Sequence, residues 1–208
     1  NIDPKTFNSD PAAIEAAITP KTRAIQLVHL YGQPAQMDQI QEIAKKHNLL
    51  ILEDAAQAHL ATFNGKYVGS FGIAGSFSFY PTKNMTSGEG GMISCATDEF
   101  ARKCKLLRNQ GMEMKYKNEV VGFNTRMTDI HAAIGRVQLA KVEEWTKTRQ
   151  RNAKFLNENL SGVITPYLIP NAVHVYHQYT IRVTGHNRDK FAEEMTKRGV
   201  GNGVYYPI

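Results

Sequence analysis

Three polar residues lie within or after apolar segments of the sequence and could carry chemistry together. Asp54 comes just after the apolar run Leu49–Leu52, where a carboxylate needs a hydrogen bond or a positive partner. Lys83 lies in a glycine-rich loop after the segment Gly75–Tyr80, and a partly desolvated lysine can act as a nucleophile. Ser78 could present its hydroxyl to a phosphate. A carboxylate for a ring nitrogen, an amine for an aldehyde and a hydroxyl for a phosphate are what pyridoxal 5′-phosphate (PLP) requires.

The spacing of these residues does not by itself establish such a site. Many α/β proteins have an aspartate at a strand end and a lysine in a loop. On spacing alone, the commoner explanation is a salt-bridged Asp54 and a solvated Lys83.

The elements that would position these residues form a β-α-β pattern. Ala24–Leu30, apart from Gln26 and His29, and Leu49–Leu52 are apolar runs, typical of strands buried on both faces. Between them, Met37–His47 has helical spacing of its apolar residues. Strand, helix and strand in this order predict a parallel sheet, whose ligands bind beyond the carboxyl ends of the strands. Asp54 stands at that edge.

The rest of the chain predicts a mixed α/β protein of two parts. We expect a large domain over 1–147, and a linking helix with part of a small C-terminal α/β domain over 148–208. The further elements expected are a helix over 11–18, a hairpin around Asn64-Gly65, strands over 75–80 and 92–96, helices over 97–109 and 128–159, a strand over 173–183, a helix over 189–198 and a strand start at 204–206.

Composition narrows the class of protein. The 208 residues are 42% hydrophobic and 21% charged, with a formal net charge of +6. The basic residues are spread along predicted helices without an RNA-binding motif, so we expect no nucleic-acid partner. No apolar run approaches the ~20 residues of a membrane span, and no signal peptide is visible. The two cysteines have no metal-ligand spacing, which favours a cytoplasmic protein without a metal site.

Longer strings in the sequence are more specific than these spacings. They are His29–Pro34 (HLYGQP), Glu53–His59 (EDAAQAH), Ser76–Asn84 (SFSFYPTKN), Gly88–Gly91 (GEGG) and Gly122–Arg126 (GFNTR) followed by Asp129–Ala133. In this order, and along nearly the whole chain, they closely resemble the DegT-type nucleotide-sugar aminotransferases.

The resemblance implies a fold-type I PLP enzyme with a mainly parallel sheet flanked by helices, usually a homodimer with shared active sites. Such an enzyme moves an amino group from glutamate or glutamine to a keto sugar carried on a nucleotide. Lys83 matches the Schiff-base lysine, Asp54 the partner of the pyridine nitrogen, and Gln57 the residue beside the ring and near its hydroxyl. Ser78 matches a phosphate ligand, and Asn124 an asparagine that reaches the phosphate of the neighbouring subunit.

The sequence also departs from the family pattern. Leu60 stands where glycine is common, and Tyr205 where histidine is common before Tyr-Pro. Family members that act as dehydratases have histidine at the position of Lys83. Relatives extend further at both ends, and their N-terminal part supplies a phosphate-binding turn and an aromatic residue that stacks on the cofactor. We therefore expect residues 1–208 alone to bind PLP weakly.

Two alternatives stay open. One is a non-catalytic homologue that acts as a binding or regulatory module, which the intact Lys83, Asp54 and Ser78 disfavour. The other is a basic nucleotide-binding protein, which would need a Gly-x-Gly-x-x-Gly or Gly-Lys-Ser/Thr loop that the sequence lacks. The nucleotide, the sugar and the carbon that receives nitrogen are not determined by the sequence.

Overall fold

The centre of the molecule is a four-stranded sheet. In the computed structural model, which describes residues 1–206, its order is β1 (Ala24–Val28), β2 (Leu50–Asp54), β5 (Ala74–Ser78) and β6 (Gly91–Cys95). The first three strands run parallel, and β6 is an antiparallel edge strand. The expected α/β fold with a mainly parallel sheet is confirmed.

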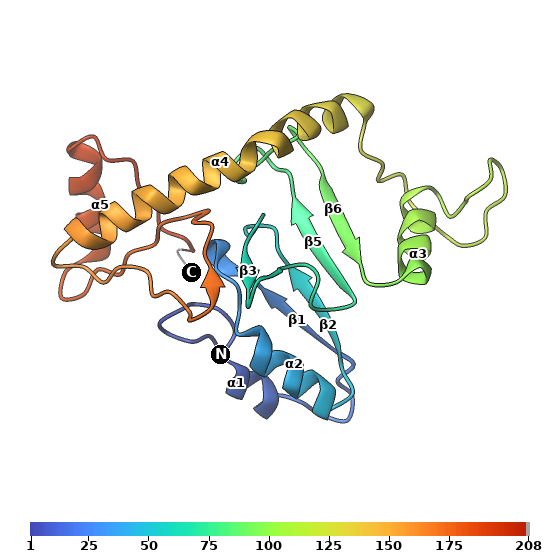
Figure 1. Ribbon diagram of the computed structural model, residues 1–208, viewed down its shortest axis with the longest axis horizontal. Coiled ribbons are helices and arrows are strands. Elements are labelled where there is room, and N and C mark those ends of the chain that lie inside the picture. The colour runs from blue at the N-terminus through green and yellow to red at the C-terminus, as the bar shows by residue number, and fades with distance from the viewer. Residues whose placement is uncertain (207–208) are drawn as a thin grey trace.

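Helix α2 (Met37–Lys46) connects β1 to β2 and covers one face of these strands (Figure 1). Its apolar side chains are fully buried or nearly so, because they pack with the strand residues in one core. Helix α1 (Pro11–Ala16) lies beside α2 and begins at Asp10, whose carboxylate accepts the Ala12 N–H. The core residues from these elements are Ile25, Leu27, Met37, Ile40, Ile43 and Ile51.

The strand register brings the candidate residues to one edge. Val28 is opposite Asp54, and Asp54 is opposite Ser76. Because β2 and β5 are parallel, Asp54 and Ser78 both lie at the carboxyl ends of their strands. This is the edge at which α/β sheets bind ligands.

Two further helices begin at threonine caps. Thr97 accepts the Phe100 N–H at the start of α3 (Asp98–Arg108), and Thr128 accepts the His131 N–H at the start of α4 (Asp129–Asn159). Helix α4 crosses beside the ends of β5 and β6, and the segment between α3 and α4 extends away from the sheet (Figure 1). Val142 is the α4 residue that is buried against Phe79 and Met85.

A second, smaller sheet joins distant parts of the chain. It contains β3 (Thr62–Phe63), β4 (Lys66–Tyr67) and β7 (Ala172–Val173), paired antiparallel in the order β4-β3-β7. The expected hairpin at Asn64-Gly65 is confirmed, and both turn residues have positive φ (49° and 76°).

The predicted strands near the C-terminus are wrong. Only β7 forms from the segment 173–183, because Tyr176 has a positive φ of 46° that interrupts the extended chain. Its N–H donates to Nδ1 of His174 (2.9 Å), and the two rings stack at 4.0 Å. The segment 204–206 is also not a strand.

The last helix, α5 (Arg188–Lys197), ends before Gly199, as expected. The first strand is shorter than predicted, since the chain turns into the 3₁₀ helix η1 (Leu30–Gly32). Among the described residues, no helix is long and apolar enough to cross a membrane.

Candidate active site

Lys83 lines a cavity of about 540 Å³ between the turn after β5 and the C-terminal segment. Gln57, which the resemblance implies as a cofactor residue, lies in the same cavity. The other lining residues are Tyr80, Thr82, His177, Gln178, Gly201, Asn202, Gly203, Tyr205 and Tyr206.

Lys83 is half-buried in a turn whose backbone is fixed. Its N–H donates to the Tyr80 carbonyl (3.0 Å), and its side chain forms no ion pair with any residue of 1–206. The next residue, Asn84, is buried and donates to the Val175 carbonyl (3.3 Å). The turn that carries Lys83 is therefore anchored to the C-terminal part of the chain.

Asp54 and Ser78 lie at the same sheet edge but do not line the cavity of Lys83. The carboxylate of Asp54 is half-buried and accepts the Ala56 N–H (3.0 Å); it has no ion-pair partner within the described part of the chain. Ser78 is also half-buried, and its hydroxyl accepts the Tyr80 N–H (3.3 Å). Both side chains keep hydrogen-bonding capacity for another group.

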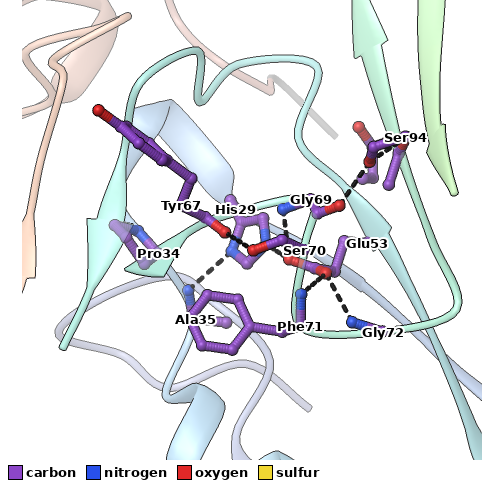
Figure 2. Close-up of polar contacts among 12 residues, drawn as sticks. His29, Pro34, Ala35, Glu53, Tyr67, Gly69, Ser70, Phe71, Gly72 and Ser94 are labelled. Carbon is purple, nitrogen blue, oxygen red and sulfur yellow. Dashed lines mark hydrogen bonds and ion pairs between the residues drawn. The ribbon is translucent and has the colours of Figure 1, made fainter. Parts of the chain in front are cut away.

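The neighbour of Asp54, Glu53, fixes the end of β2. Its buried carboxylate accepts three backbone N–H groups from the turn before β5 and one from the ring of His29 (Figure 2). Burial raises the pKa of Glu53, but the hydrogen bonds from His29, Gly69 and Gly72 outweigh it, so that the pKa lies below its ordinary value. The N–H donors are Gly69 (2.6 Å), Phe71 (2.6 Å) and Gly72 (2.8 Å).

His29 is fully buried and links Glu53 to the turn after β1. Its Nδ1 accepts the Ala35 N–H (3.0 Å), and therefore Nε2 carries the proton that is donated to Glu53 (3.0 Å; Figure 2). The hydrogen bond from His29 to Glu53 thus joins the ends of β1 and β2, and the His29 ring is in the tautomer that carries its proton on Nε2.

Gln57 has an amide of fixed orientation. Its Oε1 accepts the Tyr31 N–H (2.6 Å), so Nε2 points the other way and donates to the Tyr206 hydroxyl (3.3 Å). Gln57 therefore offers a donor on the cavity side, as a group beside a ring hydroxyl would require.

Two histidines near Lys83 remain neutral at pH 7. His59 is buried beside Phe77 and Phe79, and neither ring nitrogen has a hydrogen-bond partner within residues 1–206. Burial, and then the charge of Lys83, lower the pKa of His59 to about 4. Burial and Lys83 likewise lower the pKa of His177 to about 4, followed by Arg149 and His59.

The sequence argument did not identify His177. Its ring contacts Asn84, 93 positions earlier in the chain, with 3.0 Å between Nδ1 and Oδ1. No local pattern marks a residue whose role depends on a contact so distant in sequence. His59, in contrast, lies inside the string that starts at Glu53.

Asn124 is not brought to the cavity of Lys83. It is exposed in the segment between α3 and α4, where it forms an isolated bridge with Asn109. Leu60, where the family commonly has glycine, has a φ of 69°. A left-handed backbone at this position explains why glycine would suit it.

These groups fit a ligand of defined chemistry. Asp54 and Lys83 are half-buried charges without a counter-charge among the described residues, and burial of such groups is costly unless a ligand or solvent satisfies them. A protonated ring nitrogen for Asp54 and an aldehyde for Lys83 would meet these requirements.

Comparisons with known proteins agree on one family. The model of the DegT/DnrJ/EryC1/StrS aminotransferase family matches residues 1–208. The chain is 45% identical to a pleiotropic regulatory protein of Geobacillus stearothermophilus (100% of this chain, 57% of the relative). It is 44% identical to GDP-perosamine synthase of Caulobacter vibrioides (99% and 58%).

A solved structure, Streptomyces venezuelae DesV in complex with a ketimine intermediate, superposes with a TM-score of 0.94 at 38% identity, over 100% of this chain and 56% of DesV. The chain thus spans somewhat more than half the length of the relatives it matches. Because the family model matches residues 1–208 of this chain, the chain belongs to the DegT/DnrJ/EryC1/StrS aminotransferase family.

Proposed function

We propose that this protein is a PLP-dependent aminotransferase that transfers an amino group from glutamate or glutamine to a keto sugar carried on a nucleotide. The observation that carries the proposal is Lys83, a half-buried amine without a counter-charge among residues 1–206, in a cavity that it shares with Gln57. Family membership and the similarity to GDP-perosamine synthase support the substrate class.

Each candidate residue has a distinct role in this proposal. Lys83 holds the cofactor by its aldehyde carbon and, when released, moves a proton at its Nζ. Asp54 keeps the ring nitrogen protonated, Gln57 donates from Nε2 to the ring hydroxyl, and Ser78 binds the phosphate. Asn124 reaches the phosphate from the neighbouring subunit. When bound, PLP supplies a ring that withdraws electrons from the bond broken next to the amino group.

The proposal includes the setting of the enzyme. We place it in the cytoplasm as a homodimer with shared active sites, and its partners are the nucleotide sugar and the amino donor. We divide the chain into part of a large PLP-binding domain (1–147) and a linking helix with part of a small domain (148–208). The continuous helix α4 runs through that boundary.

A non-catalytic homologue is the competing proposal, and one relative bears the name of a regulatory protein. A protein that has lost its activity usually loses one of the reactive groups as well. Lys83, Asp54 and Ser78 are all present, which supports catalysis.

The test is the absorbance of the full-length protein with PLP, compared with Lys83→Ala. We expect a visible band that requires Lys83, disappears on reduction with borohydride and bleaches with glutamate or glutamine. Lys45→Ala, which changes an exposed lysine on α2, is the matched control and should keep the band. A full-length protein without any lysine-dependent band would favour the non-catalytic homologue.

A further inference from the structure

Tyr31 occupies an unusual backbone conformation next to the cavity of Lys83. It lies in η1 with φ 59° and ψ 4°, which residues other than glycine rarely adopt without support from their surroundings. Its buried ring packs edge-on against Phe7 (6.0 Å between centroids). A Cβ on the following Gly32 would lie 2.8 Å from the Val175 side chain and 3.0 Å from the Gln57 carbonyl, so the turn is seated closely against both.

This conformation directs the Tyr31 N–H at the side chain of Gln57. The bond to Oε1 is short, at 2.6 Å, and Oε1 is the only amide atom of Gln57 that can accept it. If the amide were reversed, its NH₂ would face the N–H of Tyr31. The turn therefore determines that Nε2 of Gln57 lies on the side of Tyr206.

The hydroxyl of Tyr31 reaches the opposite wall of the same cavity. It donates to the Tyr205 carbonyl (2.6 Å), and the segment 201–206 contributes much of the lining around Lys83. Three hydrogen bonds thus connect Tyr205 to Tyr31, Tyr31 to Gln57, and Gln57 to Tyr206. Among the hydrogen bonds of residues 1–206, loss of the Tyr31 hydroxyl would leave this wall joined to Tyr31 and Gln57 only through the bond from Gln57 to Tyr206.

We propose that Tyr31 is a positioning residue of the Lys83 cavity. Its backbone N–H sets the orientation of the Gln57 amide, and its hydroxyl holds the segment 201–206 as the wall facing Lys83. The inference deepens the proposed function and rests on it for the meaning of the cavity, but its structural content can be measured without cofactor.

The hydroxyl is tested with Tyr31→Phe in the full-length protein, prepared without PLP. Chymotrypsin cleavage after Tyr205 reports release of the wall, and the labelling rate of Lys83 by an amine reagent reports access to the cavity. We expect both rates to rise about fivefold, the effect of losing one hydrogen bond. Tyr179→Phe is the control, since its hydroxyl donates to Asn157 (2.7 Å) and does not line this cavity.

The result decides the role of the hydroxyl. Unchanged rates in Tyr31→Phe, or equal increases in Tyr31→Phe and Tyr179→Phe, would overturn it. A thermal melt of each variant separates a local release of the wall from a general loss of stability.

The backbone N–H is tested independently by hydrogen exchange. In Gln57→Ala, the Tyr31 amide loses its acceptor and should exchange about tenfold faster, whereas Gln39→Ala, which changes an exposed glutamine on α2, should leave the rate unchanged. An unchanged rate in Gln57→Ala would show that Gln57 does not hold this amide and would overturn the inference.

The two proposals can fail separately. A protein that never forms the lysine-dependent band but shows these protease and exchange effects would contradict the aminotransferase function and keep the role of Tyr31. A protein with the band but without these effects would support the aminotransferase function and contradict the role of Tyr31.

Discussion

At the scale of single residues, Lys83 has neutral imidazoles for neighbours. His59 and His177 have a pKa of about 4, mainly because they are buried and then because Lys83 is charged. Buried His174 has the same lowered value, and burial is again the main cause. His177, which lines the Lys83 cavity, thus provides a neutral imidazole whose pKa lies well below its ordinary value.

The histidines predict how stability depends on pH. The unfolded chain takes up protons below its ordinary histidine pKa of 6.5, whereas the folded chain does so only near 4, so the free energy of unfolding should fall as the pH drops from 6.5 towards 4. His59→Phe should remove about 2 kcal/mol of this loss at pH 5, measured by urea unfolding at pH 5 and 7.5.

The control for this change is His186→Phe, which alters an exposed histidine and should keep the pH dependence. Phenylalanine suits position 59 because Phe77 and Phe79 already surround it and no hydrogen bond is lost. If His59→Phe retained the full pH dependence, His59 would have to titrate normally in the folded protein.

Glu53 predicts a large effect of a small substitution. Glu53→Gln would turn an NH₂ group towards N–H donors that now bond to a carboxylate, and His29 would lose its charged acceptor. We expect the free energy of unfolding to fall by about 3 kcal/mol. Glu143→Gln, which removes an exposed i,i+4 ion pair with Lys147 on α4, should change it by less than about 0.5 kcal/mol. Similar small losses in both variants would show that the Glu53 network contributes little.

At the scale of elements, the sequence predicted what depends on local pattern. The β1-α2-β2 unit, the helix starts at 97 and 128 and the Asn64-Gly65 turn follow from apolar periodicity and side-chain hydrogen bonds to nearby amides. The segment 173–183 has strand-like composition, but a contact between His174 and Tyr176 replaces ladder pairing. The positions of Tyr31 and His177 beside the cavity were not predictable, because both depend on partners far away in the sequence.

At Leu60, in the turn after β2, we expect the glycine variant to be more stable than the alanine variant, which is the reverse of the usual order. Leu60 is half-buried and packs between two apolar clusters, so removing its side chain is destabilising. Because its φ is 69°, Leu60→Gly should be about 1 kcal/mol more stable than Leu60→Ala. At Leu106, buried in helix α3, the order should be the usual one, with alanine more stable than glycine by about 1 kcal/mol. Thermal unfolding of the four variants measures both differences, and the same order at both positions would contradict the left-handed backbone of Leu60.

At the scale of the whole molecule, the proposed dimer makes a prediction about activity. Asn124 is exposed and away from the cavity of its own Lys83. If it serves the neighbouring subunit, Lys83→Ala and Asn124→Ala proteins should each be weak or inactive alone but regain activity when mixed. In a mixed dimer, one site carries both changes and the other carries neither, so random mixing should restore about one site in four.

Mixing is measured by transaminase rate after subunit exchange, with Lys45→Ala plus Lys83→Ala as the control pair. In this control pair, half of the subunits have an intact Lys83, but neither variant repairs a defect of the other. The transaminase rate of the mixture should therefore equal the rate expected from the Lys45→Ala subunits alone. No gain from mixing Lys83→Ala with Asn124→Ala would mean that Asn124 acts within its own subunit or not at all.

The uninterrupted helix α4 sets the distance between two distant contacts that its side chains make with the rest of the molecule. Near one end, Gln138 accepts the Thr86 N–H (3.4 Å), and towards the other, Gln150 donates to the His174 carbonyl (3.0 Å). Only one helical phase satisfies both contacts. One alanine inserted between Lys141 and Lys147 would rotate the second half by about 100° and advance it about 1.5 Å. Insertions and deletions in this stretch are therefore constrained by angle as well as by length, although much of its surface is exposed.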